Sequence, residues 1–431
     1  MHQPRVISEK LTYFPERKIG QESHGGIAFE GSYEGRSVAI KRLQQANVKL
    51  VRKEIESLIK SDEHENIVRY YGVEQDLDFF YIALQRGTCN LDDFVKLCGD
   101  ENNKDDPKRN LFGDDDIKPL TKHGRPTQFL LTLLSDIVEG VKYLHKLNII
   151  HRNLKPQDIL IFKGPGRVRA KISDMAITKL LPHNIYSITN SSTGCDAKDW
   201  QPAERLVPGQ HISTAVDMFS IGCIFSFCIT DGRSHPFDTH DGRELHLNII
   251  ENKMDLKFLS HFPEAEDLIS KLISNDPKSR PTAADVSIHP MLWKSDTRIS
   301  FIYQTNIKAR EDLNSTFSQA LNNINIGIIN SNWENILDDL IKKDMQTRIQ
   351  QRCNYNVSSI LDLLRLQRNL FNHNKEKKIL YQDWKWAECE DLESYFANTF
   401  PRLFIEMYKI IFQYHKQDED FKKYFDESHN L

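Results

Sequence analysis

The sequence has few of the features of a secreted, disulfide-linked or membrane-spanning protein. Its 431 residues include only seven cysteines, an odd number, and no pair has Cys-x-x-Cys spacing. A disulfide framework and a cysteine-based zinc site therefore lose support, and a reducing compartment fits best. The longest apolar run, around Ile221–Ile229, is about half the length needed to span a bilayer. The N-terminus, MHQPRVISEKLTYF, lacks the apolar segment of a signal peptide.

No excess of one charge is present either. The 57 Lys and Arg residues and 61 Asp and Glu residues give a net charge of −4. This balance excludes a globally basic nucleic-acid binder but permits a local basic patch. The content of 39% hydrophobic and 27% charged residues is typical of a soluble globular chain. At roughly 100–200 residues per domain, the length predicts about two to four domains.

The first third of the chain predicts a β-rich segment followed by an insert. Residues 12–85 indicate short strands and one helix, with a strand at 37–42 and apolar residues at helical spacing over 48–59. Residues 99–127 are charged, weakly apolar and rich in Asn, Asp, Pro and Gly. We expect them to form a surface loop or a disordered insert.

The rest of the chain is mostly helical in pattern. Helical periodicity returns over 129–147, strand-like pieces follow near 149 and 170–173, residues 180–205 indicate a loop, and helical patterns fill 214–293. A domain boundary is predicted near 293–300, and almost all of the remainder indicates helix. Aromatic residues at core spacing in this last part are Trp333, Trp384, Trp386, Tyr395, Phe396, Phe400, Phe404, Tyr408 and Phe412. We interpret them as core.

Six short motifs occur in the order in which protein kinases carry them. They are Val38–Lys41 (VAIK), His151–Asp158 (HRNLKPQD), Asp174–Ala176 (DMA), Pro202–Glu204 (PAE), Asp217 and Arg280. Each motif alone is weak, but their shared order resembles a protein kinase. The resemblance implies a bilobal fold that binds ATP or ADP with Mg²⁺. It also implies that Glu204 and Arg280 form a buried structural pair.

The same resemblance assigns roles in the nucleotide pocket. Lys41 is implied to neutralise the α- and β-phosphates, paired with Glu54 on the following helix. Asp174 is implied to hold Mg²⁺, and Asp158 replaces the usual Asn while still offering oxygen to a hard cation. Lys155 is implied to hold the γ-phosphate in position. The predicted nucleotide-binding set is Gly20, Gly25, Ile27, Lys41, Glu54, Lys155, Asp158 and Asp174, with Asp158 and Asp174 as metal ligands.

Two departures from the kinase pattern weaken the case for phosphoryl transfer. Asn153 occupies the position of the catalytic base, and a neutral amide cannot accept the proton of a substrate hydroxyl. Glu22 replaces the second glycine of the phosphate-binding loop, where a carboxylate repels phosphate and a Cβ limits close approach. Two interpretations stay open: a pocket that still binds nucleotide, and an ion-pair set of Lys41, Glu54 and Asp174 that only holds the lobes together.

Four segments after the predicted boundary resemble a known nuclease domain. They are RISFI from Arg298, NWENILDDLI from Asn332, DLLRLQRNLFNHNKEK from Asp362 and FPRLFIEMYKIIF from Phe400. This series is similar to the kinase-extension nuclease (KEN) domain of ribonuclease L and of the inositol-requiring enzyme family, the unfolded-protein-response sensors of the endoplasmic reticulum. The segments EGSYEGRSVAIKRL, SDEHENIVRYYGV and KISDMAITKLL look closest to plant members, and the resemblance covers essentially the entire chain.

The combined resemblance implies an α+β chain with two domains. A bilobal protein-kinase-like domain is expected over 1–296, with its small lobe at about 12–86, the insert at about 99–127 and the large lobe at about 128–296. An all-α KEN domain is expected over 297–431.

The chemistry of the second domain can also be argued from its residues. Residues 360–371 have the pattern of an amphipathic helix, and Asn369 and His373 share a face if this helix continues. Tyr355 precedes the helix, and Arg365 and Arg368 lie on or next to the same face. Cationic residues surround these positions in sequence: Lys342, Lys343, Arg348, Arg352, Lys375, Lys377 and Lys378. Such a patch suits RNA cleavage without a metal.

In that reaction the 2′-hydroxyl of RNA attacks the adjacent phosphate. His373 fits the general acid, and Tyr355 can serve as the base. Arg368 and Asn369 are suited to stabilising the pentacoordinate phosphate. By resemblance, Tyr355, Arg368, Asn369 and His373 are the positions that match the nuclease motif of the family.

The leading hypothesis is a metal-independent endoribonuclease that a kinase-like, nucleotide-binding domain regulates. By resemblance it would act as a homodimer or higher oligomer on stem-loop messenger RNA, in splicing and decay. Two alternatives stay open: an active Ser/Thr kinase with a helical accessory domain, and a catalytically silent dimerisation scaffold. The expected location is cytoplasmic, either as a free protein or as the cytosolic portion of a longer protein of the endoplasmic reticulum membrane.

Overall fold

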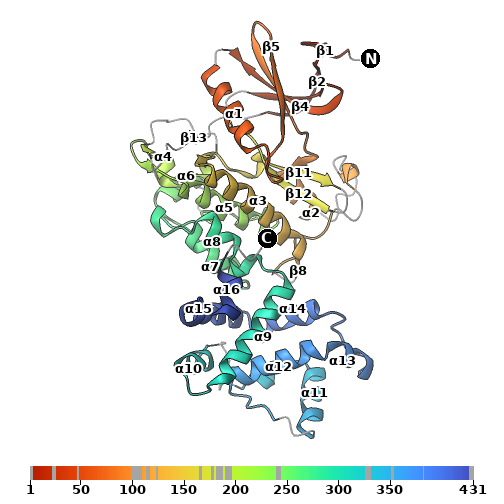
Figure 1. Ribbon diagram of the computed structural model, residues 1–431, viewed down its shortest axis with the longest axis vertical. Coiled ribbons are helices and arrows are strands. Elements are labelled where there is room, and N and C mark those ends of the chain that lie inside the picture. Colours follow the sequence, from red (N-terminus) through yellow and green to blue (C-terminus); the bar gives the residue numbers. More distant parts are fainter. Residues whose placement is uncertain are drawn as a thin grey trace. The chain divides into compact units, whose positions relative to one another are not determined.

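The computed structural model describes residues 3–21, 26–45, 48–99, 109–112, 117–122, 125–164, 167–175, 179–180, 188–189, 197–238, 244–325, 332–350, 354–381 and 383–426. The chain divides into two compact units. The first unit comprises Met1–Lys257 and Leu268–Ser287, and the second comprises Phe258–Asp267 and Ile288–Leu431. Figure 1 shows the elements of both units in sequence colours.

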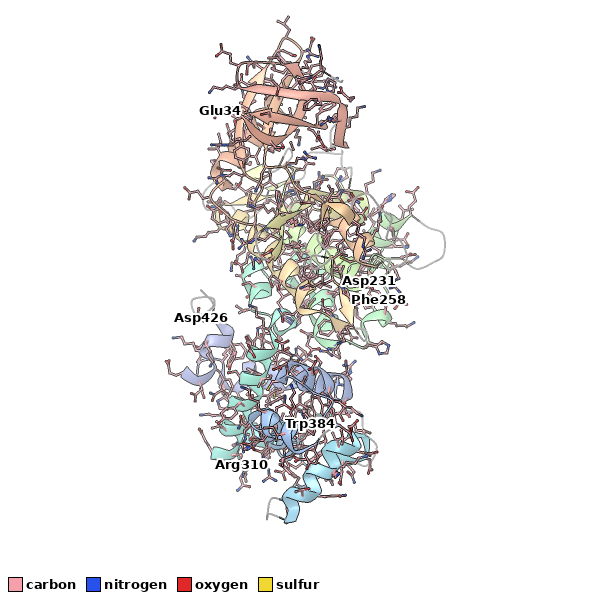
Figure 2. All side chains as sticks on the ribbon, turned by 90° about the vertical axis from the view of Figure 1, so that its right-hand side faces the viewer. Glu34, Asp231, Phe258, Arg310, Trp384 and Asp426 are labelled. Atoms are coloured by element: carbon pink, nitrogen blue, oxygen red, sulfur yellow. The ribbon has the colours of Figure 1, made fainter. Side chains whose placement is uncertain are left out.

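The first unit begins with a six-stranded antiparallel sheet in the order β1-β2-β3-β4-β6-β5. Its strands are β1 (Arg5–Val6), β2 (Leu11–Gln21), β3 (Ile27–Tyr33), β4 (Arg36–Gln44), β5 (Tyr70–Gln75) and β6 (Phe79–Leu84). Alternation along β4 buries Val38 and Ile40 completely. Glu34, labelled in Figure 2, and Gly35 form the hairpin between β3 and β4, and both have positive φ, as such a two-residue turn requires.

In the described part of the chain, one helix lies between β4 and β5, and the predicted strand and helix are both present. The helix α1 (Val48–Ser61) contains the predicted helical stretch, and β4 contains the predicted strand. Both predictions are confirmed.

The remainder of the first unit is mainly helical. Its longer helices are α2 (Leu91–Gly99), α3 (Gln128–Lys146) and α5 (Ala215–Ile229), and its shorter ones are α4 (Ala203–Leu206), α6 (Leu245–Ile250) and α8 (Ala283–Ser287). A three-stranded sheet in the order β12-β11-β7 is formed by β7 (Cys89–Asn90), β11 (Ile159–Gly164) and β12 (Arg167–Ile172). Short strand pairs join β8 (Thr121–Lys122) to β9 (Arg125–Pro126), β10 (Ile149–Ile150) to β13 (Lys179–Leu180), and β14 (Ile188–Thr189) to β15 (His211–Ile212).

The longest apolar run lies in α5, where every residue from Val216 to Ile229 is buried. A helix that is apolar on all sides is typical of a protein core. Among the described residues, no helix is both long and apolar enough to cross a membrane.

The predicted insert over 99–127 is only partly a surface loop. A 3₁₀ turn (Arg109–Leu111) and the β8–β9 hairpin lie within it. Phe112 is 6% exposed and stacks at a tilt on Phe94, and Leu120 is 1% exposed. The expectation of a weakly apolar surface segment is wrong at these two residues, because each fills apolar space. Much of the acidic run lies outside the described residues.

The described part of the second unit contains helices and no strand (Figure 1). Its helices are α9 (Ser295–Glu311), α10 (Thr316–Asn322), α11 (Asp339–Gln350), α12 (Ile360–Asn372), α13 (Asn374–Leu380), α14 (Cys389–Thr399), α15 (Leu403–His415) and α16 (Glu419–Phe425). The helix α7 (Pro263–Leu272) begins within this unit's residues. The helical prediction for the chain after the boundary is therefore confirmed where the structure describes it.

The core of the second unit is a cluster of aromatic and aliphatic side chains. Within it, Trp333 is completely buried and Phe400 is 1% exposed. The prediction that the aromatic set is core is confirmed for most of its members. It is wrong for Phe412, which is 44% exposed.

Candidate functional site

A buried lysine joins two carboxylates in the first unit. Strand β4 directs Lys41 inward, and its side chain is 1% exposed. Its Nζ lies 2.7 Å from Oε1 of Glu54 on α1 and 2.7 Å from Oδ1 of Asp174. The predicted pairing of Lys41 with Glu54 is confirmed. One buried cation thus bridges two buried carboxylates that come from distant parts of the chain.

The backbone around Asp174 brings it next to the loop of residues 151–158. Asp174 has a φ of +54°, an unusual value for a residue with a Cβ. The preceding residue, Ser173, donates from its amide (2.8 Å) and its hydroxyl (3.0 Å) to the carbonyl of Asp158. The carbonyl of Ser173 contacts Nε2 of His151 at 2.8 Å. The backbones that carry the two predicted metal ligands are therefore linked.

The side chain of Asp158 lies close to two other groups of its loop. Nδ2 of Asn153 donates to Oδ2 of Asp158 over 3.5 Å, and Nζ of Lys155 lies 3.9 Å from Oδ1. Asn153 is completely buried, and Asp158 is 5% exposed. The amide and the carboxylate of this loop therefore contact each other.

Asp217, at the start of α5, holds the beginning of the same loop. It accepts hydrogen bonds from the amides of His151 (2.9 Å) and Arg152 (2.8 Å), and it contacts Nε2 of His145 (2.9 Å). Burial opposes ionisation of Asp217, but the hydrogen bond and charge of His145 hold its pKa below the usual value. Asp217 therefore fixes the backbone from which Asn153 and Asp158 project.

The predicted phosphate-binding loop is described only at its two ends. Gly20 pairs with Ala28, and Gln21 pairs with Ile27, in the β2–β3 ladder. A Cβ added at Gly20 would meet no atom within 4 Å, so packing does not require glycine there. Glu22 and Gly25 lie outside the described residues.

Glu204 and Arg280 form the buried pair that the sequence predicts. Arg280 donates from Nη1 to Oε1 of Glu204 over 2.5 Å and from Nη2 to Oε2 over 3.2 Å. Its guanidinium also lies 5.1 Å from the ring centre of Phe219. Such a bidentate pair fixes geometry and needs no role in chemistry.

In the second unit, a hydrogen-bonded chain connects three of the predicted nuclease residues. The helix α12 begins after Ser359, whose side chain accepts from the amide of Asp362. Near its other end, Nδ2 of Asn369 donates to the hydroxyl of Tyr355 over 2.9 Å. Nη2 of Arg368 donates to Oδ1 of Asn369 over 3.2 Å. The structure thus brings Tyr355, Asn369 and Arg368 together.

A second arginine covers the ring of Tyr355. The guanidinium carbon of Arg365 lies 4.5 Å from the ring centre, within the range of a cation–π contact. Arg365 also donates to the carbonyl of Asn354, and its Nε lies 3.3 Å from Oδ1 of Asp362. These contacts hold Tyr355 against α12, although its own segment is not helical.

His373 lies at the junction of α12 and α13. Its amide donates to the carbonyl of Asn369 over 3.2 Å, so the backbone continues the helical hydrogen-bonding pattern to this residue. The helix assignment itself ends at Asn372. Nδ1 of His373 lies 2.9 Å from Oε2 of Glu376, and the imidazole is 43% exposed. When Nδ1 donates to Glu376, Nε2 is the ring nitrogen that can face a substrate.

The cationic residues around these positions do not all face solvent. Lys343, Lys375 and Lys378 are exposed, and Lys342 is partly exposed. Lys377 is buried, because it forms an ion pair with the fully buried Asp344. Its inclusion in a surface patch is therefore wrong. Arg352 lies outside the described residues, and the side chain of Arg348 is not described.

Sequence reasoning missed three contacts that fix the elements around the predicted nuclease residues. One is Glu376 on His373. The second is the ion pair of Asp344 with Lys377. The third anchors α13, because Nε1 of Trp384, labelled in Figure 2, donates to Oδ1 of Asn374 over 2.8 Å. Only the i,i+3 spacing of His373 and Glu376 could have been seen in the sequence.

A buried cluster of charges lies within the second unit. Arg298 of α9 donates to Glu393 of α14 (2.6 Å) and to Glu264 of α7 (2.7 Å), and its guanidinium lies 3.7 Å from the ring centre of Phe404. Burial lowers the pKa of Arg298, but the two carboxylates raise it further, so the net shift is upward. A small pocket adjoins this cluster, and Leu364 of α12 lines it.

Comparison with known proteins gives two family matches along the chain. Residues 13–292 match the protein kinase domain, and residues 303–425 match the family described as Ribonuclease 2-5A.

Whole-chain similarity extends to proteins that carry both domains. The chain is 40% identical over 421 residues to the rice protein named "Serine/threonine-protein kinase/endoribonuclease IRE1". The aligned region covers 98% of this chain and 45% of that protein. It is 38% identical to Arabidopsis thaliana IRE1a over 432 residues, or 96% of this chain and 50% of that protein. The chain thus spans about half the length of these relatives.

A shorter Arabidopsis relative matches over most of its own length. It is 31% identical over 456 residues, which cover 98% of this chain and 79% of that protein. Its name is "Inactive serine/threonine-protein kinase/endoribonuclease IRE1-like". The two domain matches and these identities together show that the chain belongs to the IRE1 family of protein kinase/endoribonucleases.

Proposed function

We propose that this chain is an endoribonuclease that a nucleotide-binding, kinase-like domain regulates. The observation that carries the nuclease proposal is the chain of hydrogen bonds from Arg368 through Asn369 to Tyr355, with His373 one backbone hydrogen bond away. The names of the rice and Arabidopsis relatives include both activities, which supports this reading.

The proposed reaction is transesterification within RNA. Tyr355 takes the proton of a 2′-hydroxyl, whose oxygen then bonds to the adjacent phosphorus. His373 gives a proton to the 5′-oxygen as its bond to phosphorus breaks. Arg368 and Asn369 place a cation and an amide donor next to the charge that develops on the phosphate. The products are a 2′,3′-cyclic phosphate and a free 5′-hydroxyl, and no metal is required.

The hydrogen bond from Asn369 suits the role of Tyr355 as base. A donor to the phenolic oxygen stabilises the phenolate more than the phenol. The cation of Arg365 over the ring favours the same charge state. These two contacts support Tyr355 as the proposed base.

The kinase-like pocket fits ATP or ADP with Mg²⁺. Lys41, held by Glu54, offers a cation for the phosphates, and Asp158 and Asp174 offer carboxylate oxygens to Mg²⁺. Bound Mg²⁺ would neutralise phosphate charge there. Transfer of phosphate to protein is lost or weak in this proposal, because Asn153 cannot accept a proton. Gly20, Gly25, Ile27 and Lys155 complete the proposed nucleotide site.

The wider proposal concerns organisation and partners. We propose a kinase-like domain over 1–296 and a KEN domain over 297–431, acting as a homodimer or higher oligomer. The proposed substrate is stem-loop messenger RNA in an unfolded-protein-response-type pathway, including splicing. The proposed location is the cytoplasm, as a separate protein or as the cytosolic portion of a membrane protein.

Cleavage of a small stem-loop RNA over a range of protein concentrations tests this proposal. We expect a rate that rises more steeply than protein concentration, because the active form is a dimer, and that rises further with ADP and Mg²⁺. A Lys41→Ala variant should lose the nucleotide-dependent part, and Lys60→Ala, which alters an exposed lysine of α1, should retain it. Dimers without any cleavage would instead identify a silent scaffold.

The active-kinase alternative is supported by the intact pairing of Lys41 with Glu54. Incubation with labelled ATP distinguishes this alternative from a domain that only binds nucleotide. Rapid phosphate incorporation by the parent chain would favour the kinase.

A further inference from the structure

The short helix α13 has its polar and apolar residues on the reverse faces from those of an ordinary surface helix. Asn374 and Lys377, which are one i,i+3 step apart, are only 3% and 6% exposed. Ile379 and Leu380 are 84% and 68% exposed. A surface helix usually buries its apolar side chains and leaves its charges in water. In α13, two large apolar side chains instead face solvent next to each other.

Polar contacts anchor the inner face of α13. Lys377 forms its ion pair with Asp344 of α11. Asn374 accepts at Oδ1 from Nε1 of Trp384 (2.8 Å) and donates from Nδ2 to the carbonyl of Trp386 (3.2 Å). A rotation of the helix that buried its outer face would break all three contacts. The exposure of the apolar pair is therefore built into the way this helix is held.

Lysines adjoin the exposed apolar pair. Lys375, Lys378 and Ile379 have i, i+3 and i+4 spacing, so they share one face of α13. Both lysines are exposed, and neither forms an ion pair with a described residue. Lys343, which is exposed on α11, has its Nζ 5.8 Å from the ring centre of Tyr381, the residue that follows α13. The outer face thus combines apolar surface with positive charge.

This outer face begins beside the proposed general acid. His373 immediately precedes α13, and Ile379 follows it by six residues, which is roughly 9 Å along a helix. The carboxylate of Glu376 on the same helix contacts Nδ1 of His373. A nucleotide next to the bond that His373 is proposed to break therefore comes within reach of the apolar pair.

The charge of this face favours RNA over a second copy of the chain as its partner. A two-fold contact between two copies would bring the same surface patch of each together, and with it the lysines of both. Like charges that meet in this way oppose association. The phosphates of RNA instead carry the opposite charge and lie next to bases that offer apolar faces.

We propose that Ile379 and Leu380 form a subsite for the base of an unpaired nucleotide next to the cleaved phosphate, and that Lys375 and Lys378 contact the flanking phosphates. Bases in single-stranded loops are unstacked and can pack on protein side chains. Leucine and isoleucine are among the residues that nucleic-acid-binding proteins place against bases. The inference rests on the proposed function and deepens it, because it states which part of a stem-loop the chain contacts.

A binding cycle of protein and RNA variants tests the base contact. The RNA is a stem-loop with deoxyribose throughout its loop, so that the loop has no 2′-hydroxyl to attack, and a set of RNAs lacks each loop base in turn. The proteins are the parent and I379A/L380A, and the measurement is fluorescence anisotropy. At one loop position, loss of the base should weaken binding to the parent about 10-fold and binding to the variant far less. Equal weakening of both proteins at every position would overturn the proposal.

Two further variants control this cycle and test the phosphate contacts. Leu313→Ala alters another exposed leucine of the second unit and should bind every RNA as the parent does. Lys375→Gln combined with Lys378→Gln should reduce the slope of log Kd against log salt by about 1.4, because two phosphate contacts are lost. An unchanged slope would overturn the phosphate contacts.

Two other measurements separate this proposal from its competitors. I379A/L380A should keep the parent's Tm and its sedimentation behaviour, since both side chains are exposed. A variant that loses dimers but binds RNA normally would identify a contact between copies and overturn the proposal. If the parent cleaves no all-ribose stem-loop while the cycle still shows the loss at one base, the proposed nuclease fails and the base contact stands.

Discussion

Asn369 occupies the central position among the proposed nuclease residues, because it accepts from Arg368 and donates to Tyr355. Its amide can do both only in one orientation, and the arginine at Oδ1 fixes that orientation. The side chain that we propose to stabilise the phosphate is thus also the one that contacts the proposed base. Removing it should impair both functions at once.

Replacement of the proposed acid is the first prediction at the scale of residues. His373→Ala should reduce RNA cleavage by about 10²–10⁴-fold, the range expected when a general acid is lost. The imidazole is 43% exposed, so stability should hardly change. His261→Ala, which alters an exposed histidine of the same unit, is the matched control. A His373→Ala protein that cleaves at the parent rate would remove this residue from the mechanism.

Replacement of the proposed base separates chemistry from packing. Tyr355→Phe removes the hydroxyl that accepts from Asn369 but keeps the ring beneath Arg365. We expect a loss of about 10²-fold or more in kcat, with KM and Tm nearly unchanged. The measurement is steady-state cleavage of a stem-loop RNA. A change in KM alone would show that Tyr355 only contributes to binding.

At the scale of single residues, the sequence predicts which residues belong to the candidate site better than it predicts the contacts between them. Tyr355, Arg368, Asn369 and His373 could be chosen because they match a motif, and Glu54 because it follows Lys41 on a helix. The contact of Arg365 with Tyr355 could not be foreseen, since it depends on how a non-helical segment folds back onto α12. The contact of Asn153 with Asp158 likewise follows from the shape of a loop.

Among the elements, α13 depends on a buried ion pair. Lys377 of α13 and Asp344 of α11 are both buried, and Tyr381 also donates to Asp344 over 3.3 Å. Lys377→Met should destabilise the chain by about 3–5 kcal/mol, because it leaves a buried carboxylate without its cation.

The matched variant for this prediction removes both charges. Lys377→Met with Asp344→Leu should recover most of the lost stability, since apolar residues can replace a buried pair. Denaturant unfolding of the three proteins measures this difference. If the double variant is no more stable than Lys377→Met, the ion pair is not what holds α13.

The sequence predicts helices and strands well where apolar residues repeat over a long stretch. It predicts poorly where only single apolar residues are buried. The helices α1 and α3 and the strand β4 follow from apolar spacing alone. In the insert, Phe112 and Leu120 are isolated apolar residues among charged ones, so no periodic pattern marked them as buried. The burial of Lys377 could not be predicted for a different reason, because its partner Asp344 is 33 positions away in the sequence.

At the scale of the whole molecule, we expect that the chain does not phosphorylate itself. The segment Ser187–Thr193 contains five Ser and Thr residues, and most of it lies outside the described residues. With Asn153 at the base position, these residues should gain no phosphate during incubation with ATP and Mg²⁺. Mass spectrometry decides this, with Lys41→Ala as the control. Stoichiometric phosphate on the parent alone would show that the base is dispensable.

We propose above that the chain cleaves RNA by metal-independent transesterification at Tyr355 and His373. The most direct test is analysis of the product ends after cleavage of a stem-loop RNA in EDTA, using the parent and His373→Ala. We expect 2′,3′-cyclic phosphate and 5′-hydroxyl ends from the parent in EDTA, and almost no product from the variant. Cleavage that requires a divalent cation, or that leaves 5′-phosphate ends, would contradict it.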